Sequence, residues 1–214
     1  MKGLIRNNFY SMGGGMKIAF LMSAVLMFIP LFTKDYKILT IVIAIQIFCF
    51  ISNTGAALRA DEVSKWNKFE LTLPVKASTV VAAKYLSFGA LILCGFAMSA
   101  ATGGIAAARW QEMSVARSLA WGYSYGLTLS VITSAVMYPV MLKIGTEKNE
   151  LILLVSAFFA IGFMAVIAFF LAPFTGGMNM TGILVGEVSL AGALILLVVS
   201  YRISLWIYRK KEFC

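Results

Sequence analysis

Few residues in this chain have a side chain and a sequence context suited to catalysis, nucleotide binding or metal binding. The 214 residues include no His, so the commonest general base and metal ligand is absent. Glu187 is the only acid inside the long apolar runs, and no GxxxxGK[ST] segment is present to bind a nucleotide phosphate. We predict no catalytic, cofactor or metal site. Glu187 is interpreted as a contact on a transport path or, alternatively, as an acid near the membrane interface.

The longest polar segment, residues 59–84, is the second place where residue types suggest a function. Acids followed by apolar residues at three-residue spacing predict a helix over residues 61–73, with its acids in the first turn and one apolar side. Such a helix is typical of a docking site for a cytosolic partner. The alternative is an interfacial helix whose Trp66 lies among lipid headgroups. The candidate docking residues are Asp61, Glu62, Lys65, Trp66, Phe69, Leu73 and Pro74.

Small residues recur at four-residue steps in two apolar runs. Such rows let helix backbones approach closely in lipid, so helix packing is the default interpretation. A transport path or a subunit interface is the alternative. The residues concerned are Gly122, Gly126, Ser130 and Ser134 in one run, and Gly182 and Gly186 in the other.

The composition excludes a soluble globule. Hydrophobic residues make up 61% of the chain and charged residues 13%, with a mean hydropathy of +0.90. Charges delimit six apolar runs, each read as a transmembrane helix, although the first is short for a bilayer. We therefore predict a single all-α integral membrane domain over residues 1–214. The six spans are expected at residues 18–33, 38–58, 85–108, 118–142, 151–172 and 183–201.

Two further segments carry structural predictions. Residues 1–17 place apolar residues at helical spacing, which predicts an interfacial helix that Gly13, Gly14 and Gly15 then break. Residues 173–182 are uncharged and apolar enough to form a short re-entrant gate.

The distribution of basic residues predicts the orientation. Fourteen Lys and Arg residues fall at the two termini and in the loops 59–84 and 143–150, whereas four fall on the opposite side. We expect the chain in the plasma membrane, and the positive-inside rule then places both of its termini in the cytoplasm. The formal net charge of +9 is spread between apolar runs, which favours anionic lipid over nucleic acid as its partner.

The polar segment also resembles a known family. Its acidic pair Asp61-Glu62, the Lys65-Trp66 pair, the Leu73-Pro74 pair and the Lys84-Tyr85 pair at the start of the third span resemble the signature of small permease subunits of type-2 ABC exporters. Lys76-Ala77 stands where relatives commonly carry a Ser-Arg pair. The six spans and the interfacial leader extend the similarity loosely over the whole chain.

The resemblance implies a division of labour between subunits. ATP and Mg would bind a separate cytosolic ATPase subunit, which docks on the coupling helix, while this chain pairs with a second permease copy or a homologue. An apolar interior favours a hydrophobic or amphipathic cargo, with a peptide before a lipid. Two alternatives stay open: a non-transporting scaffold or self-protection protein that binds a peptide, and an intramembrane enzyme of lipid chemistry.

Overall fold

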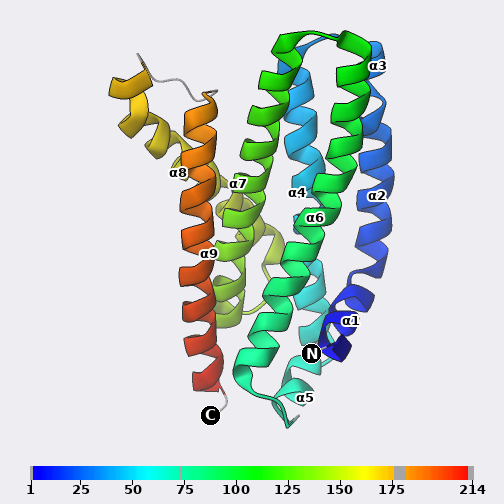
Figure 1. Ribbon diagram of the computed structural model, residues 1–214. Coiled ribbons are helices and arrows are strands. Elements are labelled where there is room, and N and C mark those ends of the chain that lie inside the picture. Colours follow the sequence, from blue (N-terminus) through cyan, green and yellow to red (C-terminus); the bar gives the residue numbers. More distant parts are fainter. Residues whose placement is uncertain (1, 73, 176–181, 212–214) are drawn as a thin grey trace.

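The computed structural model describes residues 2–72, 74–175 and 182–211, and in this part of the chain every regular element is an α-helix (Figure 1). Six helical segments among the described residues are long and apolar enough to cross a membrane, as the sequence predicted. The elements are α1 (Lys2–Ser11), α2 (Gly13–Met27), α3 (Ile29–Phe32), α4 (Tyr36–Val63), α5 (Trp66–Thr72), α6 (Ala77–Trp110), α7 (Met113–Ile144), α8 (Asn149–Thr175) and α9 (Ile183–Lys211).

The first span differs from the prediction. The three consecutive glycines do not form the break between helices but the first turn of α2. The span therefore covers Gly13–Phe32 and reaches 20 residues. The break falls one residue earlier, at Met12. At Gly15, a Cβ would lie 2.0 Å from Asn53 Oδ1, so a larger residue there would have to displace the Asn53 side chain where α2 crosses α4.

The core of the bundle lies between α4, α6 and α7. In the most apolar stretch of each span, 61% of residues are buried in α4 and 56% in α7, against 17% in the first span and 28% in α8 and in α9. Figure 1 shows α8 leaning away from the bundle at the end distant from α1. The outer helices therefore leave most of their apolar stretches unburied within this chain.

Three of the small residues predicted from the sequence, Gly122, Gly126 and Gly186, lie at contacts between helices of this chain. A Cβ at Gly126 would lie 2.9 Å from the Ala44 Cα of α4, and one at Gly186 would lie 2.3 Å from Ser124 Oγ of α7. Gly122 faces α4 in the same way, and the side chains of Ser130 and Ser134 are buried. Gly182 precedes α9. These positions account for close packing of α7 against α4 and of α9 against α7.

The two ends of the bundle differ in what they hold. We call the end with α1, α5, residues 145–148 and the last turn of α9 the terminal end, and the opposite end the far end (Figure 1). At the far end, Trp110 Nε1 donates to the Pro30 carbonyl at 3.2 Å, and Asp35 caps α4 by accepting from Lys37 N at 2.8 Å. The expected re-entrant gate at 173–182 lies largely outside the described residues.

Candidate functional site: a polar cluster at the terminal end

The acidic pair of the polar segment belongs to a different helix from the one predicted. The predicted helix over residues 61–73 is wrong because α4 continues to Val63, and α5 covers only Trp66–Thr72. Residues 56–62 contain no helix breaker, so α4 extends beyond its apolar run. The chain then turns at Lys65, whose φ is +58°. Asp61 and Glu62 thus lie in the last turn of α4, where the helix dipole disfavours acids.

Asp61 is held there by a buried ion pair with α6. Lys84 Nζ lies 2.5 Å from Asp61 Oδ2, and both side chains are almost completely buried. Lys84 also donates to Asn8 Oδ1 at 2.6 Å, and Ser11 Oγ donates to Asp61 Oδ1 at 3.2 Å. A buried charge pair is tolerated when further hydrogen bonds satisfy its remaining donors and acceptors, and α1 supplies them here.

The same network fastens α1 to the bundle. Asn8 Nδ2 donates to Ser87 Oγ at 3.0 Å, so this buried amide contacts α6 through both of its polar atoms. The sequence analysis identified neither Asn8 nor Lys84 as a buried residue. Leu4, Asn8 and Met12 follow one another at four-residue spacing, and all three are buried. That spacing was the available signal that Asn8 faces inward.

Glu70 brings α5 to the cluster. Its buried carboxyl lines a cavity of about 310 Å³ together with Asp61, Lys84, Tyr138 and Tyr208. Burial raises the pKa of Glu70; the Asp61 charge raises it further, whereas the Lys84 charge opposes the rise. Glu62 and Lys68 also line the cavity, which therefore gathers three acids and two bases from α4, α5 and α6.

Glu62 links the end of α4 to the connection between α7 and α8. Its Oε2 accepts from the Thr146 backbone N at 2.9 Å and from the Thr146 hydroxyl at 2.5 Å. Thr146 is itself buried. One turn of α4 therefore contacts α1 and α6 through Asp61, and the 145–148 connection through Glu62.

The two aromatic residues of α5 have different surroundings. Trp66 is half-buried against the hydrophobic core, with its Nε1 buried and without a hydrogen-bond partner among the described residues. Phe69 is 54% exposed, and the two ring centroids lie 5.3 Å apart. The sequence interpretation treated both as exposed anchors, but Phe69 alone has that exposure. Lys65 and Lys68 are exposed beside it.

The remaining candidates lie outside this cluster. Leu73 is not among the described residues, and Pro74 forms an exposed bend before α6. Glu187 is exposed near the start of α9 at the far end, and within the described chain no ion pair joins it to Arg109 or Arg117.

The fold and the site define a class of protein: a multi-pass helical membrane protein that displays a short helix from a polar cluster at one end. Comparison with protein families identifies it further. The family described as ABC-2 family transporter protein matches residues 3–209, so the chain belongs to this family and is a transporter membrane subunit. Membership implies a typically non-catalytic membrane domain with no cofactor of its own and with a partner ATPase subunit. No curated protein and no solved structure matches the chain.

Proposed function

We propose that this chain is the membrane subunit of an ATP-driven exporter, and that the ATPase subunit docks on α5. The observation that carries the proposal is the exposure of Phe69 on a short helix whose Trp66 packs against the core of the bundle and whose Glu70 is buried. An exposed aromatic flanked by lysines is a suitable anchor for a protein partner. A force applied to α5 would reach the spans through Trp66, which packs against the hydrophobic core.

Binding of the ATPase subunit to two matched variants tests this proposal. Phe69→Ala removes the exposed anchor of α5, and Met113→Ala removes an exposed apolar side chain at the far end, where Met113 is 92% exposed. A buried interfacial aromatic contributes about 2 kcal/mol or more, so Phe69→Ala should weaken binding by about thirtyfold. Met113→Ala should bind as wild type does. Equal recovery of the ATPase by all three proteins in a pull-down would contradict docking on α5.

The proposed orientation places the terminal end in the cytoplasm. It is supported by the asymmetry of basic residues, which remains large even though Lys84 is buried and does not act as a loop charge. In a variant whose native cysteines are replaced, a Cys at position 113 should react with an impermeant maleimide on intact cells. A Cys at position 148 should react after lysis alone. The reverse pattern would invert the topology.

The complete exporter would contain two permease subunits, two ATPase subunits and their bound ATP and Mg. The largely exposed apolar surfaces of the first and fifth spans, α2 with α3 and α8, are the proposed contacts with a second copy or a homologue. Cys pairs along these helices should cross-link between subunits, and no cross-link from either helix would oppose the dimer.

The proposed cargo is hydrophobic or amphipathic, with a peptide ahead of a lipid. The described spans contain one buried ion pair, at the terminal end, and their other buried polar side chains are uncharged. Export of a labelled amphipathic peptide from vesicles that contain the reconstituted complex should require ATP. Peptide binding without ATP-dependent movement would favour the self-protection alternative, whereas turnover of lipid by this chain alone would favour the enzyme.

A further inference from the structure

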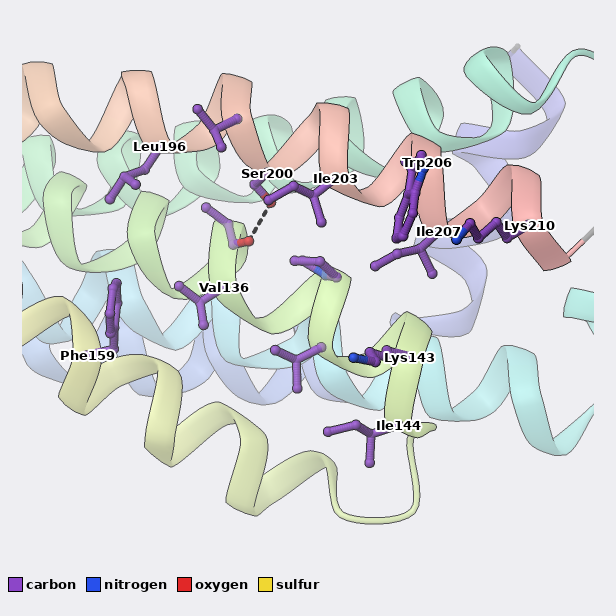
Figure 2. Close-up of a pocket in the computed structure, with 14 residues that line it drawn as sticks. Val136, Lys143, Ile144, Phe159, Leu196, Ser200, Ile203, Trp206, Ile207 and Lys210 are labelled. Atoms are coloured by element: carbon purple, nitrogen blue, oxygen red, sulfur yellow. Dashed lines mark hydrogen bonds between the residues drawn. The ribbon is translucent and has the colours of Figure 1, made fainter.

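A groove of about 810 Å³ lies between α7 and α9, with Phe159 of α8 at one side. Figure 2 shows Val136, Leu196 and Ile203 along it, and these residues come from both long helices. The lining is apolar except for Ser200, Trp206, Lys143 and Lys210. Because both helices are candidate membrane spans, the groove is expected to face the hydrocarbon region.

The backbone carbonyl that Pro139 leaves without a helical partner in this groove is hydrogen-bonded by Ser200. A proline inside α7 has no N–H to offer the carbonyl of Ala135, four residues earlier. The Ser200 hydroxyl of α9 donates to that carbonyl instead, as the dashed line in Figure 2 marks, and the Tyr85 hydroxyl lies 2.6 Å from Ser200 Oγ. With these polar atoms paired to one another, the groove offers an apolar surface suited to an acyl chain.

The terminal end of the groove is cationic. Lys143 stands in the last turn of α7 and Lys210 in the last turn of α9, and Figure 2 shows both at the same end of the groove. Both are exposed, and neither is ion-paired to a residue that the structure describes. Lys210 Nζ lies 3.8 Å from the centroid of the Trp206 ring, an amphipathic side chain typical of the membrane interface.

We propose that the groove binds one anionic phospholipid, with an acyl chain against α7 and α9 and the headgroup phosphate between Lys143 and Lys210. Charge complementarity selects this occupant, because an apolar groove that ends in two lysines, neither ion-paired within the described chain, matches an acyl chain that ends in a phosphate. The exposed position of the lysines at the ends of two spans puts their ammonium groups at headgroup depth. The lipid is a resident ligand, so its binding requires neither the ATPase subunit nor ATP.

Native mass spectrometry of the detergent-purified full chain can test the proposal with phosphatidylglycerol and phosphatidylcholine of identical acyl chains. The first variant is Lys143→Gln/Lys210→Gln. The charge-matched control is Lys17→Gln/Lys148→Gln, which removes two exposed lysines outside the groove. The third variant, Ile203→Trp, fills the groove at a side chain that is already exposed to lipid and is therefore expected to fold. Glycerol 3-phosphate serves as a headgroup without acyl chains.

Wild type and the Lys17/Lys148 control should retain one phosphatidylglycerol in preference to phosphatidylcholine. The Lys143/Lys210 variant should lose about fivefold in preference per lysine, or about 30-fold together. Ile203→Trp should lose both lipids, and glycerol 3-phosphate should not bind. Equal preference in the Lys143/Lys210 variant and wild type would overturn the proposal. Loss of a dimer of this chain, rather than of bound lipid, in the Lys143/Lys210 variant or in Ile203→Trp would also overturn the proposal. Displacement of the lipid by an amphipathic peptide, to the same extent with and without the two lysines, would overturn it as well.

Discussion

The two ends of the bundle each hold a lysine–carboxylate pair, and the two pairs have nearly equal lengths. Lys84–Asp61 at the terminal end spans 2.5 Å and Lys34–Glu112 at the far end spans 2.6 Å. The side chains are 8% and 7% exposed in the first pair but 57% and 46% exposed in the second. Burial rather than distance therefore separates them: loss of one partner leaves an unpaired charge in the protein at the terminal end and a hydrated charge at the far end.

The pairs also differ in what they connect. The buried pair brings α4 and α6 together and takes further hydrogen bonds from α1, whereas the exposed pair joins two connections at the far end. Tyr36 adds a hydroxyl hydrogen bond to Glu112 there. The terminal end is thus the end where one buried network connects three helices, an arrangement that suits the proposed docking of another subunit there.

The largest effect is expected from breaking the buried pair. Asp61→Leu should lower the free energy of unfolding by about 3–5 kcal/mol, because Lys84 is left buried without its partner. The double variant Asp61→Leu/Lys84→Met should recover most of that loss. Titration with sodium dodecyl sulfate in mixed micelles measures both. Equal losses in the single and double variants would mean that the unpaired charge is not the cause.

A smaller loss is expected at Glu62. Glu62→Ala removes the acceptor of the Thr146 backbone and hydroxyl hydrogens and should cost about 1–3 kcal/mol, since Thr146 is buried. Faster amide hydrogen exchange should be confined to residues 145–148 and the start of α8. Faster amide hydrogen exchange in α1 as well would show that the contacts of Asp61 and Glu62 depend on each other.

Glu70 should respond to pH in the opposite sense to a surface acid. Its pKa is raised above its ordinary value of 4.5 chiefly by burial, so the folded chain holds the proton more tightly than the unfolded chain. This contribution to stability is complete below pH 4.5 and is lost as the pH rises through the raised pKa. Glu70→Gln should raise the Tm at neutral pH and flatten its dependence on pH above 4.5. A lower Tm at neutral pH would indicate that the carboxylate is required.

The smallest effect is expected at the far end. Hydrogen bonds from Lys34 and Tyr36 lower the pKa of Glu112 to about 2. Any stabilisation by Glu112 is therefore present above its ordinary pKa of 4.5 and lost as the pH falls toward 2. Because the pair is exposed and screened by salt, Lys34→Met should leave the Tm at neutral pH within a degree or two. A loss as large as that of Asp61→Leu would contradict the contrast between the two ends.

The sequence predicted the six candidate membrane helices because charges delimit apolar runs, and such runs have few alternatives to a helix in lipid. The sequence-based predictions were wrong where contacts between helices determine which side chains are buried and where a helix ends. The side chain of Asn8 is buried because α6 offers it Lys84 and Ser87, residues far from it in the chain. Asp61 was assigned to the wrong helix because a stretch without breakers gives no sign of where α4 ends. The groove is lined by α7 and α9, and its Ser200 hydroxyl donates to the Ala135 carbonyl of the other helix, a contact that spacing along either helix cannot reveal.

Site-specific photo-crosslinking tests the central claim, that the terminal end receives the ATPase subunit on α5, most directly. A photoreactive amino acid is placed at position 69 or, as the control, at position 113 of the chain in cells that contain the assembled transporter. The account predicts an adduct with the ATPase subunit from position 69 and none from position 113. An adduct from position 113, or none from position 69 in a complex that retains the ATPase, would contradict it.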